Sequence, residues 1–118
     1  MGSKTKIFYL WSPVFLAMAA IFYFSALPGQ DIPAVFCGQD IIFHAGIYGI
    51  LAFFLIRALK NTYTRITPFR RGILAVLFCF AYGISDEFHQ SFVPNRDPAL
   101  FDVGVDVFGA IFTTIIYR

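Results

Sequence analysis

Acidic, histidine and glutamine side chains lie inside two strongly apolar segments in the second half of the chain. These residues are Asp86, Glu87, His89 and Gln90 in one segment, and Asp102 and Asp106 in the next. An ionisable residue near the middle of a membrane helix costs about 2.5–3.5 kcal/mol, so its presence there favours a functional role. Carboxylates and imidazoles that lie close together can bind a metal ion, hold an amine or transfer protons.

The spacing of these residues places them in pairs, because residues three or four positions apart share a helix face. The pairs are His44 with Tyr48, Asp86 with His89, and Asp102 with Asp106. Helical rise puts the pairs at similar depths when consecutive helices run antiparallel, and Ser25 reaches the same level from the first apolar segment. We therefore expect one polar layer built from all four segments. Gly109, on the face of Asp106, would let another helix approach closely.

A metal site is one candidate use of this layer. The spacing Asp86-x-x-His89 resembles the Glu-x-x-His pattern with which one helix supplies two ligands to a carboxylate-rich metal site, but it occurs once. The candidate metal ligands are Asp86, Glu87, His89 and Asp106, and Mn, Fe, Mg or Zn would suit them. Glu87, His89 and Asp106 are also the candidate catalytic acids and bases. No nucleophile motif is present, and the sequence leaves both metal binding and catalysis open.

The layer carries more negative than positive charge. Its carboxylates are Asp86, Glu87, Asp102 and Asp106, against one certain cation, Arg96. Carboxylates this close together cannot all ionise unaided, so either some stay protonated or a metal ion or an amine of a ligand completes the set. A purely structural interpretation also stays open. In it, the acids bond to one another and to Arg96 and only hold the helices together.

Four apolar segments must position these residues. They span about 7–27, 41–59, 72–92 and 99–117, and each is long enough to cross about 30 Å of hydrocarbon as a helix. Of the 118 residues, 58% are hydrophobic and 14% are charged, where soluble domains carry about a quarter charged residues. That composition excludes a soluble globule and a disordered chain, and a net charge of +2 argues against a nucleic-acid binder. We predict an all-α, polytopic membrane protein, a single domain 1–118 folded as a four-transmembrane-helix bundle.

Lysine and arginine predict the orientation, because cytoplasmic loops carry an excess of both. Lys4 and Lys6 precede the first segment, and five Lys or Arg residues lie within 57–71. The stretch 28–40 has none, and only Arg96 lies between the third and fourth segments. Both chain ends are therefore expected in the cytoplasm, and the polar layer faces outward. A cleaved signal peptide is the alternative for the N-terminus, but its apolar run is longer than the usual 7–15 residues.

The polar residues resemble the signature of VanZ-like membrane proteins. That pattern reads D-E-x-x-Q-x-F-x-P-x-R, followed at fixed spacing by an Asp, an Asn or Asp, and a Gly; it also has H-x-x-x-Y on the second span and S-x-x-P at the end of the first. The matching positions are Ser25, Pro28, His44, Tyr48, Asp86, Glu87, Gln90, Phe92, Pro94, Arg96, Asp102, Asp106 and Gly109. Two positions depart from it: Ile41 replaces a frequent basic residue, and Asn95 replaces a loop glycine but still tolerates a left-handed turn.

The resemblance implies a bacterial cell-membrane protein linked to tolerance of the glycopeptide teicoplanin through a more general cell-envelope activity. We expect ligand-binding residues at Ser25, His44, Tyr48, Asp86, Glu87, Gln90, Arg96, Asp102 and Asp106. The first hypothesis is binding or movement of a lipid or cell-envelope ligand, with Arg96 on its phosphate. The alternatives are a membrane-embedded hydrolase or transferase acting on a lipid-linked substrate, with or without a divalent metal, and a structural polar layer. Membrane lipids are the expected partners, and a thin bundle could form homo-oligomers.

Overall fold

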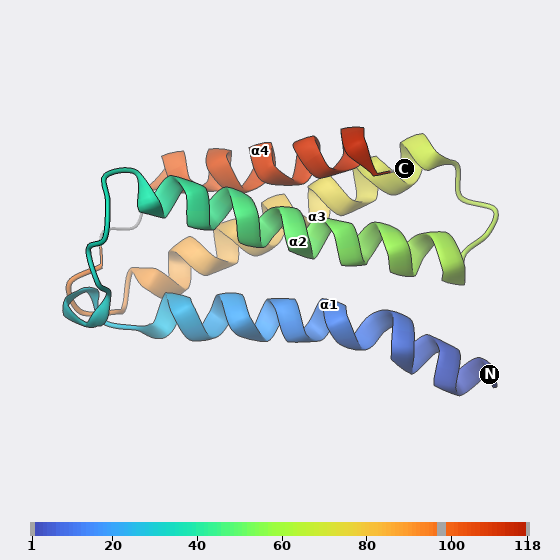
Figure 1. Cartoon of the computed structure of the whole chain (residues 1–118), viewed down its shortest axis with the longest axis horizontal. Coiled ribbons are helices and arrows are strands. Elements are labelled where there is room, and N and C mark those ends of the chain that lie inside the picture. The colour runs from blue at the N-terminus through green and yellow to red at the C-terminus, as the bar shows by residue number, and fades with distance from the viewer. Residues whose placement is uncertain (1, 97–98, 118) are drawn as a thin grey trace.

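A computed structural model describes residues 2–96 and 99–117, and these form a bundle of four α-helices. The helices are α1 (Ser3–Ala26), α2 (Gln39–Thr62), α3 (Pro68–Gln90) and α4 (Leu100–Ile116), with a short 3₁₀ helix, η1 (Gly29–Asp31), after α1. Successive helices run antiparallel, so the N-terminal end of α1, the C-terminal end of α4 and the α2–α3 loop lie at one end (Figure 1). The all-helical, four-helix prediction is confirmed. Residues 1, 97, 98 and 118 of the predicted domain lie outside the described part.

Three of the helices meet the length and hydropathy expected of a membrane span: α1, α2 and α3, with 24, 24 and 23 residues. Helix α4 has 17 residues, about 26 Å at 1.5 Å per residue, which is the short limit for crossing the hydrocarbon. The bundle is 45 Å long, matching the roughly 40–45 Å of a bilayer with its headgroups.

Helix ends differ from the predicted spans by a few residues, because polar residues extend helices beyond the apolar run. Helix α2 continues to Thr62 although its apolar segment ends near residue 59. Helix α3 begins four residues earlier than predicted, at Pro68, whose missing N–H suits a first helical turn. The Thr67 hydroxyl caps this turn by accepting from the Arg70 N–H at 3.3 Å.

Helices α2 and α3 each pack against all three other helices. Helices α1 and α4 both pack on α2 and α3 and do not contact each other in the described chain. The α2–α4 approach is closest at Gly109, where a Cβ would collide with the carbonyl oxygen of Ala45. One turn further along, the Thr113 hydroxyl donates to the carbonyl of Gly49 at 3.0 Å. The predicted role of Gly109 in close packing is confirmed.

Large apolar side chains cover the outside of the bundle. Phe8, Phe88 and Phe108 are 73%, 69% and 65% exposed, and many other Phe, Ile and Leu side chains are exposed as well. The interior meanwhile buries carboxylates, among them the fully buried Asp106. A surface this apolar would aggregate in water but is well solvated by lipid chains. The distribution of apolar and charged side chains is therefore that of an integral membrane protein.

Candidate functional site

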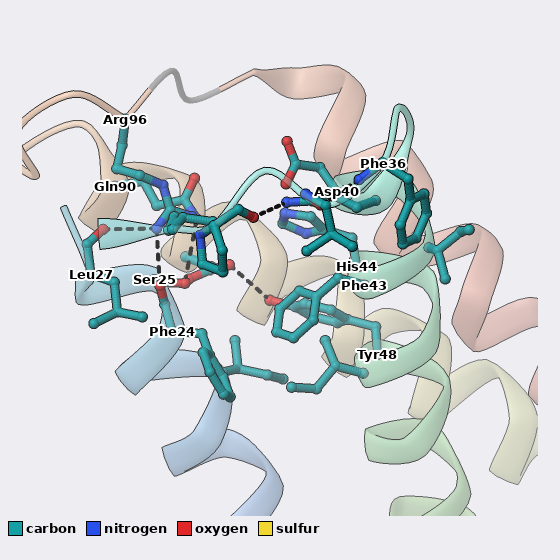
Figure 2. A pocket seen from close by; sticks show the side chains of 18 residues that line it. Phe24, Ser25, Leu27, Phe36, Asp40, Phe43, His44, Tyr48, Gln90 and Arg96 are labelled. Carbon is teal, nitrogen blue, oxygen red and sulfur yellow. Dashed lines mark hydrogen bonds between the residues drawn. The ribbon is translucent and has the colours of Figure 1, made fainter. Parts of the chain in front are cut away.

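A cavity of about 470 Å³ lies at the end of the bundle opposite the chain ends, between α1, α2 and the linker that joins them (Figure 2). Its volume is within the roughly 300–1,000 Å³ of small-molecule sites. Apolar side chains make most of the wall, including Ile21, Phe24, Phe36, Phe43 and Ile47. The polar residues that line it are Ser25, Gln39, Asp40, His44, Tyr48, Asp86, Gln90 and Arg96. The cavity is thus apolar with a polar end.

Three helices meet at the buried carboxylate of Asp86 on α3. The Ser25 hydroxyl of α1 donates to one carboxylate oxygen, and the Tyr48 hydroxyl of α2 lies 3.5 Å from the other. One turn along α3, the Gln90 amide nitrogen lies 3.5 Å from the Ser25 oxygen. All four side chains are at least nine-tenths buried. This cluster fixes the polar end of the cavity, because moving any of the three helices would break a buried hydrogen bond.

His44 lines the cavity, and a contact with Asp106 of α4 orients its ring. Its Nδ1 lies 2.8 Å from an Asp106 carboxylate oxygen, on the side away from the cavity. The second oxygen of Asp106 is buried with no hydrogen-bond partner among the described residues. Gly83 of α3 lies opposite, and a Cβ there would be 3.0 Å from that oxygen, a tight contact. An Nδ1–carboxylate bond of this kind sets the tautomer and leaves Nε2 as the reactive nitrogen of the ring.

Arg96 is held by backbone carbonyls. Its Nη1 donates to the carbonyls of Phe24 and Leu27, both at 2.9 Å, and so satisfies two of the last carbonyls of α1. In the described residues no carboxylate lies within ion-pair distance of this guanidinium, and Nε and Nη2 have no hydrogen bond. The structural interpretation expects Arg96 to pair with the acids of the layer, and the described residues contain no such ion pair. The guanidinium keeps N–H donors for an anion.

The loop that carries Arg96 is fastened to η1. The Gly29 N–H donates to the carbonyl of Pro94 at 3.0 Å, and the Asn95 amide donates to the Gln30 side chain at 2.7 Å. Asn95 has a φ of 58°, so this position does adopt the left-handed turn that the sequence allowed. Glycine is required at position 29, since a Cβ there would overlap the carbonyl of Asn95. These contacts place Arg96 at the cavity edge.

Four predicted residues do not line the cavity: Glu87, Asp102, His89 and Asp106. Glu87 accepts from the backbone N–H of Ala99 at 2.7 Å and so caps the start of α4, while its other oxygen is buried without a partner in the described chain. Asp102 is half-buried in the first turn of α4. His89 stacks on Phe22 with ring centroids 4.4 Å apart. The cavity wall contains six of the nine predicted ligand-binding residues: Ser25, His44, Tyr48, Asp86, Gln90 and Arg96. Asp106 acts on it only through His44.

The four candidate metal ligands have separate contacts. Asp86 and His89 both face α1, at Ser25 and Phe22, whereas Glu87 is turned by about 100° from Asp86 and contacts the start of α4, and Asp106 contacts His44 of α2. In 2–96 and 99–117, no group of three or more His, Cys, Asp or Glu side chains is placed to hold a metal ion. Metal binding stays a prediction that this arrangement does not support.

Several cavity residues were missed by sequence reasoning. The linker between α1 and α2 lines the cavity, at Ile32, Pro33, Val35 and Phe36. The Gln39 side chain holds it: Oε1 accepts from the Val35 and Phe36 N–H groups at 2.7 and 3.2 Å, and Nε2 donates to the Pro33 carbonyl at 2.7 Å. Asp40, the next residue after Gln39, also lines the cavity. A Gln after Gly38 is the only signal of this arrangement, and it is too common to be diagnostic. The phenylalanines of the wall cannot be told from those that face lipid.

The fold and the site define a helical membrane protein with a partly apolar, partly charged cavity at one end of its bundle. The chain matches the VanZ/LLP1 family over residues 10–118 and belongs to that family. The resemblance to VanZ-like proteins is confirmed, and the link to teicoplanin resistance is a property of that family. No curated protein and no solved structure matches the chain.

Proposed function

We propose that this protein binds an amphiphilic lipid or lipid-linked cell-envelope ligand in the cavity between α1 and α2. The observation that carries the proposal is the division of the cavity into an apolar wall and a polar end with unpaired guanidinium donors. An alkyl or isoprenoid chain would lie along Phe24, Phe43 and Ile47, and an anionic headgroup would bind Arg96.

Selectivity for the ligand must come from the polar end. A lipid chain that leaves the bilayer for an apolar cavity gains little, because both surroundings are equally apolar. A phosphate that meets guanidinium, amide and imidazole donors gains charge-assisted hydrogen bonds in a medium of low dielectric constant. Arg96, Gln90 and His44 are therefore the residues that we expect to set affinity.

We further propose that the chain crosses the bacterial cytoplasmic membrane four times, with both chain ends in the cytoplasm. The support is the basic stretch 57–71 together with the near absence of Lys and Arg from the two loops at the cavity end. The cavity then opens at the outer leaflet, where lipid-linked cell-wall precursors and glycopeptides are present. Teicoplanin tolerance, known for the family, would follow from binding or moving such a ligand.

Lipid retained by the purified protein tests the proposal. The parent protein, after extraction in mild detergent and extensive washing, should retain an amphiphile that mass spectrometry identifies. Ile47→Trp fills the cavity and should abolish retention, whereas Ile84→Trp adds the same bulk at an exposed position of α3 outside the cavity and should not. Equal retention by all three proteins would show only surface lipid and would refute the proposal.

A second candidate function is favoured by the His44–Asp106 pair. A cavity-lining imidazole oriented by a buried carboxylate could act as an acid or base in hydrolysis or group transfer on a lipid-linked substrate. Turnover of lipid pyrophosphates by the purified protein, lost in His44→Gln, would favour this enzyme. Binding without turnover would leave the binding function alone.

A further inference from the structure

Two opposite charges on the cavity wall lack a charged partner in the described chain. Asp40, in the first turn of α2, is exposed and makes no hydrogen bond or ion pair within residues 2–96 and 99–117. Arg96 retains Nε and Nη2, since only Nη1 is engaged by the carbonyls of α1. Figure 2 shows Arg96 beyond the end of α1 and Asp40 at the start of α2, both along the same edge of the cavity.

The two side chains do not neutralise each other, because no ion pair joins them within 4 Å. A ligand that is only anionic would bind Arg96 but would bring its charge toward Asp40 and the buried Asp86. A ligand that is only cationic would leave the guanidinium without a counter-charge. A ligand with both charges satisfies both side chains at once.

Aromatic rings in the same cavity favour an amine as the positive group. Phe24 and Phe43 line the cavity and form an edge-to-face pair with centroids 5.2 Å apart. The face of an aromatic ring attracts an ammonium group, so rings in the cavity wall favour a positive group in the ligand. Ile21 and Ile47 extend the apolar wall away from the charged edge.

We propose that the ligand is a zwitterionic amphiphile of the phosphate–ammonium class, with its phosphate on Arg96, its ammonium toward Asp40 and its chain along the apolar wall. The inference rests on the proposed function and specifies its headgroup. A different role for Asp40 is stabilisation of the positive N-terminal end of α2. That role affects the stability of the helix but gives no preference between a phospholipid with an amine in its headgroup and one without.

Short-chain phospholipids test the headgroup directly. We would titrate the purified protein in detergent with dioctanoyl phosphatidylethanolamine and with dioctanoyl phosphatidylglycerol, which has the phosphate but no amine, and measure binding by native mass spectrometry. The ethanolamine lipid should bind about three- to fivefold more tightly, the gain typical of a partly exposed ion pair. Soluble phosphoethanolamine should bind far more weakly. If it bound as tightly as the lipid, the ligand would be a free zwitterion, and the amphiphile would be refuted.

Substitutions test which residues cause the preference for the ethanolamine lipid. Asp40→Asn should remove the preference for ethanolamine, while Asp31→Asn, which removes the same charge in η1 outside the cavity, should keep it. Arg96→Gln should weaken both lipids alike. The inference would be overturned if the parent bound the two lipids equally, or if the preference for ethanolamine survived in Asp40→Asn. In either case, binding that depends on Arg96 would still support the proposed function. No binding of either lipid would refute the proposed function itself.

Discussion

Gly109 offers a sharp test of the packing that builds the site. Its Cα lies so close to α2 that a Cβ would overlap the carbonyl oxygen and carbon of Ala45, which are backbone atoms that cannot rotate away. Gly109→Ala must therefore push α4 and α2 apart. Overpacking of this kind costs about 1–3 kcal/mol, and the gain of about 1 kcal/mol from replacing a helical glycine offsets only part of it.

Gly104 supplies the matched control on the same helix. It is exposed, and a Cβ there meets no atom within 4 Å, so Gly104→Ala should stabilise the protein by about 0.5–1 kcal/mol. The two alanine variants should then differ by about 1–3 kcal/mol in the free energy of unfolding. Reversible unfolding in mixed micelles of mild detergent and dodecyl sulfate measures this difference.

The same substitution should also damage the site. Ala45 is next to His44, and Gly109 is one turn from Asp106, so separating the helices should lengthen the 2.8 Å bond between His44 and Asp106. We expect Gly109→Ala, but not Gly104→Ala, to weaken lipid binding. If the two variants unfolded alike and bound lipid alike, the close approach of α2 and α4 would be refuted.

Three further substitutions probe contacts around the cavity. Ser25→Ala removes a hydroxyl donor from a buried carboxylate of α3 and should destabilise the protein by about 1–3 kcal/mol in the same unfolding assay, whereas Ser85→Ala, at an exposed position, should change little. Tyr82→Phe deletes a 2.7 Å hydrogen bond to the carbonyl of Met18 and should cost about 0.6 kcal/mol, as is usual between membrane helices; a loss above about 2 kcal/mol would contradict this. Gln39→Ala frees the linker over the cavity and should speed release of a bound short-chain lipid in stopped-flow measurements; an unchanged release rate would mean that the linker does not retain the ligand.

The helices could be predicted from the sequence because membrane spans have a strong physical signature. Each apolar run has the length that the hydrocarbon demands, and Pro28 and Pro33 break the chain after the first run. The helix ends were predicted less well. Polar residues such as Gln39 and Thr62 continue a helix without contributing to the apolar pattern.

The site could be predicted only in part. Depth and helix face brought Ser25, Tyr48 and Asp86 to one layer, and the structure joins them at one carboxylate. Depth alone could not show that Glu87 points away from Asp86, toward the start of α4. Nor could the sequence show that the linker covers the space between α1 and α2, since this depends on backbone hydrogen bonds to a single side chain.

A crystal structure grown from a lipid mesophase that contains phosphatidylethanolamine tests the central claim most directly. We expect density for an amphiphile in the cavity, with its phosphate within hydrogen-bond distance of Arg96 and its chain between Phe24 and Phe43. The contradicting result is a cavity closed by these two rings, with lipid density confined to the outer surface of the bundle.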